Sequence, residues 1–306
     1  MNLFQNKRKL RSIKEFLYIL PFILLVGVFC YYPLYGWMYA FFDYRPPQPL
    51  TSSNFVGLKW FQSLVANPVK TKQIVSVMVN TLVMSGITVG TSWLPMFFAV
   101  FLNEIKYVPF RKTVQTVTTI PNFISWVLVY SVAFNIFNNT GVVNHVLVAW
   151  GILDAPVQFL QKSDHVWITQ WLWLTWKNLG WAAIMYIAAI TGIDEQMFEA
   201  AKVDGATRMQ RIRYITIPSI LPTYFVLLML AIASFLSNGM EQYYVFQNAF
   251  NKEHIQVLDL YVFNLAMGSG SYSVATALSI LKSIISLVLL TAANGISKLV
   301  RGESFL

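Results

Sequence analysis

The residues best suited to chemistry in this sequence are polar groups inside long apolar runs. Lys177 and Asn178 interrupt a run that is dense in tryptophan, and a second polar cluster lies at the end of the next run. Polar side chains are costly at membrane depth and therefore mark candidate substrate or ion pathways. We predict a pathway lined by both clusters and their aromatic neighbours: Trp173, Trp176, Lys177, Asn178, Asn238, Glu241, Gln242, Tyr243 and Tyr244.

Each of these residues also has a structural interpretation. Tryptophan and tyrosine at the ends of membrane spans often form an interfacial belt. Lys177 can extend its amine along its apolar stem to the membrane surface, or it can pair with Glu241. A buried Lys177 would also suit an anionic solute. The sequence leaves these alternatives open.

The sequence contains no constellation for catalysis or cofactor binding. It lacks the G-x-x-x-x-G-K-[ST] phosphate loop that ATP-hydrolysing domains carry. Its histidines, His145, His165 and His254, do not have the spacing of metal ligands. Cys30 is the one cysteine, which excludes an internal disulfide framework. We therefore expect no enzyme activity, no cofactor and no metal on this chain.

The elements that must position these residues are membrane-spanning helices. Of the 306 residues, 56% are hydrophobic and 11% are charged, whereas soluble domains have about 25% charged residues. Backbone groups in lipid must pair within their own segment, so apolar runs of about 20 residues predict helices. We expect an all-α integral membrane protein with six transmembrane helices, near 16–43, 73–102, 113–137, 165–191, 218–247 and 273–299. They form one domain, 16–299, between an N-terminal segment at 1–15 and a tail at 300–306.

Lysine and arginine set the orientation of the spans, because they cluster in cytoplasmic loops. Most of them lie on one side of the predicted bundle, at 7–14, 106–112, 202–213 and 298–301. Both termini and the 192–217 loop are therefore predicted to be cytoplasmic. The same placement explains the net charge of +9, so we expect membrane lipids, and no nucleic acid, as partners. On the other side, a short re-entrant or surface helix is expected within 138–164.

The 192–217 loop contains an amphipathic helix followed by a turn. Phe198, Ala201 and the Val203/Ala206 region are predicted to share its apolar side. Gly205 permits a left-handed backbone that ends the helix and redirects the chain. A second amphipathic segment follows, and Pro218 occupies a position where a new helix begins, since its missing N–H is not needed there.

The run EAAKVDGATRMQRIRYITIP, at 199–218, resembles the EAA loop of type I ABC importer permeases. Ile212 and Ile217 stand where that loop usually has an aromatic residue and a leucine. The resemblance implies that the first short helix docks on an ATPase subunit and transmits its motion to the spans. The residues that it assigns to this coupling are Glu199, Ala200, Ala201, Asp204, Gly205, Ala206, Arg208 and Pro218.

Other segments resemble the polysaccharide and complex-oligosaccharide branch of these permeases. They are YYPLYG at 31–36, NFVGLKWF at 54–61, IPNFISWV at 120–127, where Asn122 replaces an expected histidine, and SYSVATA at 271–277. The resemblance implies the methionine-permease-like type I fold in a bacterial cytoplasmic membrane. It also implies a solute-binding protein that delivers a sugar, a second permease in a heterodimer, and an ATPase dimer that holds ATP and magnesium.

Three alternatives are weighed against this interpretation. An ion-coupled secondary transporter would show inverted repeats and broken helices, and a membrane enzyme acting on lipid-linked sugars would cluster Asp, Glu or His on one loop. The sequence shows neither signature. An ABC importer for a non-sugar solute would share the coupling loop, and only the branch-level segments argue against it.

Overall fold

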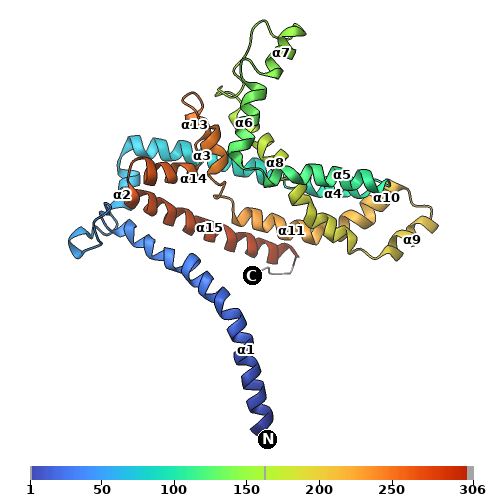
Figure 1. The fold of residues 1–306 in the computed structure, drawn as a ribbon, viewed down its shortest axis with the longest axis horizontal. Coiled ribbons are helices and arrows are strands. Elements are labelled where there is room, and N and C mark those ends of the chain that lie inside the picture. The colour runs from blue at the N-terminus through green and yellow to red at the C-terminus, as the bar shows by residue number, and fades with distance from the viewer. Residues whose placement is uncertain (1, 162, 302–306) are drawn as a thin grey trace. The chain divides into compact units, whose positions relative to one another are not determined.

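The computed structural model describes residues 2–161 and 163–301, which are predominantly helical (Figure 1). The chain divides into two compact units. Unit 1 holds the residues up to Asn67 together with Asn264–Leu281, and unit 2 holds Pro68–Phe263 together with the residues from Lys282 onward. Of the predicted tail at 300–306, residues 302–306 lie outside the described range.

Five helical segments in the described range are long and apolar enough to cross a membrane. They are Ile13–Phe41, Pro68–Asn103, Trp126–Ala149, Arg208–Ala233 and Tyr272–Gly295. The predicted span at 165–191 is also helical, as α8 (Val166–Thr191), but it is not among the five. Its tryptophan, lysine, asparagine and glutamine side chains lower its mean hydropathy, so the count of six spans stays a prediction.

Unit 1 is built around a long helical segment at the N-terminal end. α1 (Asn2–Val26) continues as a π turn and then as a 3-10 helix that ends at Phe41. The Ser273 hydroxyl, at the start of α15 (Tyr272–Arg301), donates to the Phe42 carbonyl at 2.7 Å. The Trp60 indole, on α2 (Lys59–Ala66), donates to the same carbonyl at 3.0 Å. Both bonds hold the residue after this helical segment, Phe42, against α2 and the start of α15.

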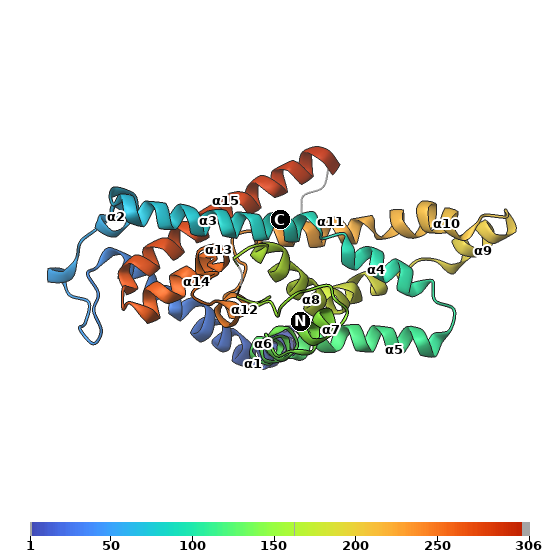
Figure 2. The ribbon, with the colours of Figure 1, turned by 90° about the horizontal axis from the view of Figure 1, so that it is seen from above.

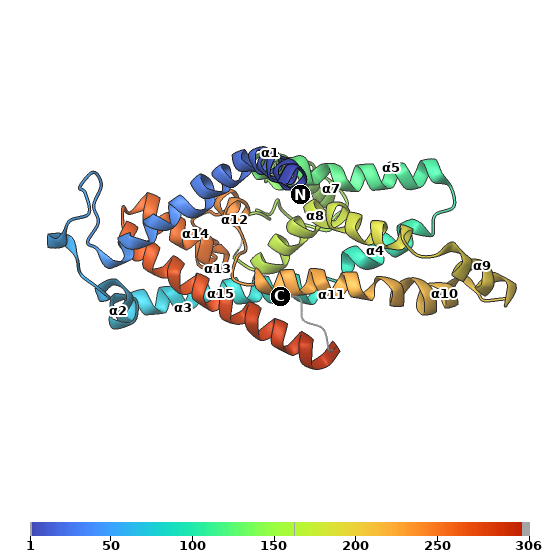
Figure 3. The same ribbon diagram turned by 90° about the horizontal axis from the view of Figure 1, so that it is seen from below.

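Unit 2 contains the remaining helices. They are α3 (Pro68–Gly90), α4 (Leu94–Asn103), α5 (Val108–Thr119), α6 (Trp126–Phe137), α7 (Val142–Ala149), α8, α9 (Glu195–Val203), α10 (Arg208–Arg211), α11 (Ile217–Ala233), α12 (Glu241–Phe246), α13 (Lys252–Ile255), α14 (Leu258–Phe263) and the rest of α15. α7 is the short helix that was expected within 138–164. In all three ribbon views, the turn between α4 and α5 lies at the same end of unit 2 as α9 and α10 (Figures 2 and 3).

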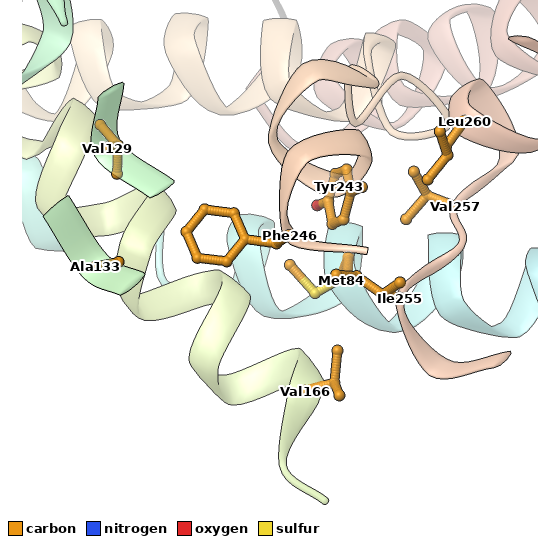
Figure 4. Close-up of a cluster of buried hydrophobic side chains, with 9 residues drawn as sticks. All are labelled: Met84, Val129, Ala133, Val166, Tyr243, Phe246, Ile255, Val257 and Leu260. Atoms are coloured by element: carbon orange, nitrogen blue, oxygen red, sulfur yellow. The ribbon is translucent and has the colours of Figure 1, made fainter. Parts of the chain in front are cut away.

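Two apolar clusters form the core of unit 2. In the first, Met84 of α3 packs with Tyr243 and Phe246 of α12, all of them buried (Figure 4). The second brings together Ala99 of α4 and Ala183 of α8, both 0% exposed. Small residues let helix backbones approach closely inside a membrane. α8 contributes to both clusters, and α3, α4, α5 and α11 pack on it.

The third and fifth predicted spans differ from the helices observed. The run at 113–137 is interrupted by a 3-10 turn at Ile120–Phe123, and α6 begins anew after Ser125, whose hydroxyl caps it. Proline cannot donate at position 121, and the serine offers a helix start. The run at 218–247 leaves the helix at Ala233, and Gly239, at φ 74°, turns the chain into α12. Hydropathy alone does not detect such breaks, because the residues around them are mostly apolar.

Candidate translocation cavity and coupling loop

A cavity of about 580 Å³ lies among α3, α4, α8, α11 and the segment that follows α11. Three of the predicted pathway residues line it: Asn178, Asn238 and Tyr243. The other polar lining is neutral and rich in hydroxyl groups, from Ser85, Thr88, Thr91, Ser92, Thr175, Tyr186, Ser234 and Ser237. Trp171 and Trp181 add aromatic surface. The lining combines aromatic faces with hydrogen-bonding groups.

Several cavity side chains are held in place by hydrogen bonds between helices. The Asn238 amide donates to the Ser85 hydroxyl at 2.9 Å, and Ser85 in turn donates to the Phe235 carbonyl. The Trp171 indole donates to the Thr91 hydroxyl at 2.9 Å. These bonds join α3 to the segment after α11, and the turn after α3 to α8, so the polar wall is fixed in position.

Two polar groups on the cavity wall have no partner among the described residues. The Tyr243 side chain is 1% exposed, and its hydroxyl makes no hydrogen bond there. The half-buried Asn178 side chain also makes none. An unsatisfied buried hydroxyl is unfavourable by about 1–3 kcal/mol. A hydrogen-bonding ligand or water in the cavity would relieve this.

Sequence reasoning missed the hydroxyl residues of α3. Ser85 and Thr88 of α3, and Ser92 in the turn that follows it, are spaced as on one side of a helix, and all three line the cavity. The signal was present, because small polar residues at i, i+3 and i+7 form a stripe on one side of a helix. The prediction considered only the fourth and fifth spans.

Lys177 does not line the cavity, and its side chain binds backbone carbonyl groups instead. Its buried ammonium donates to the carbonyl oxygens of Pro121 at 3.1 Å and Asn122 at 2.7 Å, and lies 5.4 Å from the centre of the Trp126 ring. Glu241 is exposed and forms no ion pair with it. The break after α5 leaves the Asn122 carbonyl to be paired by the lysine, which also adds a second donor to the Pro121 carbonyl beside the Ile124 amide.

Gly180, one turn along α8 from Lys177, makes the close approach to α5 possible. A Cβ at this position would lie 2.7 Å from the Thr119 amide nitrogen and would also collide with the Thr118 carbonyl. Only glycine fits where two helix backbones meet this closely. Lys177 and Gly180 together fix the end of α5 against α8.

The remaining predicted pathway residues lie outside the cavity. Trp173 packs with Phe137 and Phe246 at ring distances of 6.0 and 5.8 Å, and Trp176 packs against Trp173. The Gln242 amide donates to the Gln170 carbonyl at 2.8 Å. The last two are exposed: Glu241 and Tyr244.

The coupling loop begins with α9, which is capped at both ends. The Asp194 carboxylate accepts from the Gln196 amide at 3.0 Å at the start. At the other end, the Ala206 amide donates to the Ala201 carbonyl at 2.8 Å, and the Gly205 amide donates to the Lys202 carbonyl at 3.1 Å. This is a Schellman arrangement, which needs a left-handed residue. Gly205, at φ 75°, supplies it, as predicted.

The apolar side of α9 is narrower than the sequence suggested. Phe198 and Ala201 are half-buried, as is Ala206 after the turn, but Val203 is 88% exposed. Val203 lies five residues after Phe198, which is about 140° around a helix. The grouping of Val203 with the apolar side was therefore wrong. Glu199, Lys202 and Asp204 are exposed as well.

The second helix of the loop continues into the fifth span without interruption. Thr207 and Gln210 form a capping box at the start of α10, and a π turn at Ile212–Thr216 leads into α11. α11 begins at Ile217 and has Pro218 in its first turn, as predicted, but helical backbone runs from Arg208 to Ala233 without a break before it. Pro218 cannot donate to a carbonyl of the preceding turn. The wider π turn before it accommodates the ring.

Arg208 joins the coupling loop to the loop between α4 and α5. Its guanidinium binds the carboxylate and the backbone carbonyl of Glu104. Both loops therefore lie on the same side of the helices, as the distribution of lysine and arginine predicts.

Comparison with known proteins finds one family over most of the chain. The family described as binding-protein-dependent transport system inner membrane component matches residues 91–301, which include the whole coupling loop. Two relatives are from Bacillus subtilis (strain 168). The polygalacturonan/rhamnogalacturonan transport system permease protein YteP is 35% identical, over 96% of this chain and 92% of its own. Protein LplB is 33% identical, over 92% and 88%.

A solved structure has the same fold. It is the crystal structure of a bacterial ABC transporter involved in the import of the acidic polysaccharide alginate. One of its chains matches with a TM-score of 0.84 and 30% identity, covering 98% of this chain and 100% of that one. A bacterial alginate ABC transporter in complex with an alginate pentasaccharide-bound periplasmic protein matches with a TM-score of 0.85.

Proposed function

The chain belongs to the family of inner membrane components of binding-protein-dependent transport systems, and we propose that it is one permease half of an ATP-driven importer of polysaccharide-derived oligosaccharides. As a family member it is a multi-pass membrane protein. Two relatives that match nearly the whole chain are named for polygalacturonan/rhamnogalacturonan and for alginate, polymers that contain sugar carboxylates. Two others, at 30% and 28% identity, are named for lactose and for arabinooligosaccharides, which are neutral.

The cavity is the observation that supports a sugar cargo. Sugars are recognised by aromatic faces that stack on the ring and by polar groups that bind the hydroxyls. The cavity offers both, in Trp171 and Trp181 and in the amides of Asn178 and Asn238. The unpaired hydroxyl of Tyr243 offers a further hydrogen bond to a cargo.

The coupling loop supports the proposal that a separate ATPase subunit drives transport. The exposed side of α9, with Glu199, Lys202 and Val203, is free to dock on another subunit. ATP and magnesium would be held by that subunit, so this chain would not itself be an enzyme. Closure of an ATPase dimer would move α9, and the Arg208 contact with Glu104 would pass the motion to α4 and α5.

The remaining partners follow from the same mechanism. One permease cannot enclose a pathway, so a second, different permease would complete it as a heterodimer. A solute-binding protein would deliver the sugar on the side opposite the coupling loop. In this proposal the chain crosses a bacterial cytoplasmic membrane six times, and both termini lie in the cytoplasm.

ATP hydrolysis by the assembled complex tests the proposal. The complex is reconstituted with its binding protein, and hydrolysis is measured with acidic oligosaccharides, neutral oligosaccharides, amino acids and peptides. We expect stimulation by oligosaccharides that the binding protein retains. Stimulation by amino acids or peptides alone would contradict the sugar cargo.

A further inference from the structure

A second hollow, of about 440 Å³, lies along α5 beside α8. Its polar lining comes from one helix: Lys112, Gln115, Thr116 and Thr119. These residues are spaced at i, i+3, i+4 and i+7, so they form one stripe on α5. Its apolar lining comes from Ile120, Phe123 and Ile184. We call this hollow the α5 groove.

The stripe is unsuited to lipid. It extends into the third predicted span, where polar side chains are costly unless they face protein or water. Thr116 is exposed. Neither its hydroxyl nor the side-chain amide of Gln115 forms a hydrogen bond to another described residue. The other side of α5 is apolar and equally open, since Phe110 is 54% exposed and Val117 is 59% exposed. α5 therefore has one side for lipid and one side for something polar.

The α5 groove lies next to the cavity of about 580 Å³, and an aromatic pair stands between the two. Phe123 lines the groove, Trp181 lines the cavity, and their rings stand edge to face with centres 5.6 Å apart. Away from the cavity, the groove lining ends at Lys112, in the second turn of α5 after the α4–α5 turn, which Arg208 joins to the coupling loop. The cavity and the groove thus follow one another toward the ATPase side.

Charge distinguishes the two hollows. No charged residue lines the cavity within the described range, whereas Lys112 lines the groove at the end away from the cavity. Among the described residues, Lys112 forms no ion pair. We propose that the α5 groove is the cytoplasmic exit of the sugar route, and that Lys112 attracts the carboxylates of an acidic oligosaccharide there. This inference rests on the proposed function and specifies its substrate class.

Labelling of single cysteines tests whether the groove holds water. The assembled complex is reconstituted in liposomes with Cys30→Ser, and Thr116→Cys is compared with Val117→Cys, its neighbour on the apolar side. A membrane-impermeant maleimide should label Thr116→Cys at least about tenfold faster, since the reactive thiolate forms only in contact with water. Equal labelling of the two would overturn the groove as a water-lined exit, even if transport itself is intact.

Transport by charge variants tests the role of Lys112. Lys112→Gln should raise KM for an acidic oligosaccharide by about fivefold, as expected for one exposed ion pair, and leave KM for a neutral one unchanged. Arg111→Gln removes a neighbouring charge that does not line the groove, and it should leave both unchanged. Equal effects on the two sugars, or equal effects of the two variants, would overturn the role of Lys112. A wild-type complex that imports no oligosaccharide would instead refute the proposed function.

Discussion

Arg208 binds both the carboxylate and the backbone carbonyl of Glu104, so a residue of the coupling loop holds the turn between α4 and α5 at two points. The contact connects the segment proposed to touch the ATPase with helices on either side of it. α4 lines the cavity and α5 carries the groove. A movement of the loop would therefore reach both hollows.

Charge reversal tests this connection. Glu104→Arg should uncouple sugar-stimulated ATP hydrolysis, because it places two cations at the contact. The double variant Glu104→Arg with Arg208→Glu should recover part of the coupling. The pair is partly exposed, so stability should change by no more than about 1 kcal/mol. Stimulated hydrolysis that is unchanged in Glu104→Arg would contradict the connection.

Gly205 has a natural control in the same loop. Gly205→Ala should destabilise the turn by about 1 kcal/mol because φ is 75° there, and it should lower coupled ATP hydrolysis. Gly192, at φ −85°, should accept alanine without loss. Circular dichroism and hydrolysis with the loaded binding protein measure the two effects. If both variants behave alike, the conformation of Gly205 is not what matters.

Glu199 tests the docking surface directly. Glu199→Lys should weaken ATPase assembly and coupled hydrolysis while membrane insertion stays normal, since the side chain is exposed. Co-purification of the ATPase subunit measures assembly. Full assembly together with full coupled hydrolysis would contradict the assignment.

Tyr243→Phe should separate transport from stability. The variant removes a buried hydroxyl that has no partner, so stability should be unchanged or higher by up to about 1–3 kcal/mol. Sugar uptake should nevertheless fall, because the cargo loses a hydrogen bond. Thermal unfolding in detergent and uptake kinetics measure the two properties. Unfolding at lower temperature with normal uptake would contradict this role.

Lys177→Met should act on stability and not on selectivity. It leaves the Asn122 carbonyl without its lysine donor, at about 1–3 kcal/mol for an unpaired buried group, while the Pro121 carbonyl keeps its bond from the Ile124 amide. The exposed Lys252 provides a control, and Lys252→Met should change stability by less than about 0.5 kcal/mol. A selective loss of acidic sugar uptake in Lys177→Met, with normal stability, would restore Lys177 to the pathway.

Much of the fold could be predicted because it depends on local signals. The apolar runs locate the helices, and the EAA pattern with Gly205 predicts the turn of the coupling loop. The breaks after α5 and α11 were missed because hydropathy stays high across them. Pro121 and Gly239 mark these positions, but the same residues also occur within continuous helices.

The site was less predictable because it depends on contacts between helices. Lys177 was placed in the pathway from its charge and its predicted depth, yet its partners are carbonyls about 55 positions away in the sequence. Conversely, Ser85 was overlooked because a single serine in an apolar run is unremarkable by itself. Its role emerges only from its bonds to Phe235 and Asn238.

Uptake into proteoliposomes tests the central claim most directly. The assembled complex is reconstituted with binding protein and labelled acidic oligosaccharide on one side and ATP on the ATPase side, with no ion gradient. We predict accumulation that requires both ATP and the binding protein. Accumulation that follows an imposed proton or sodium gradient and does not require ATP would contradict the claim.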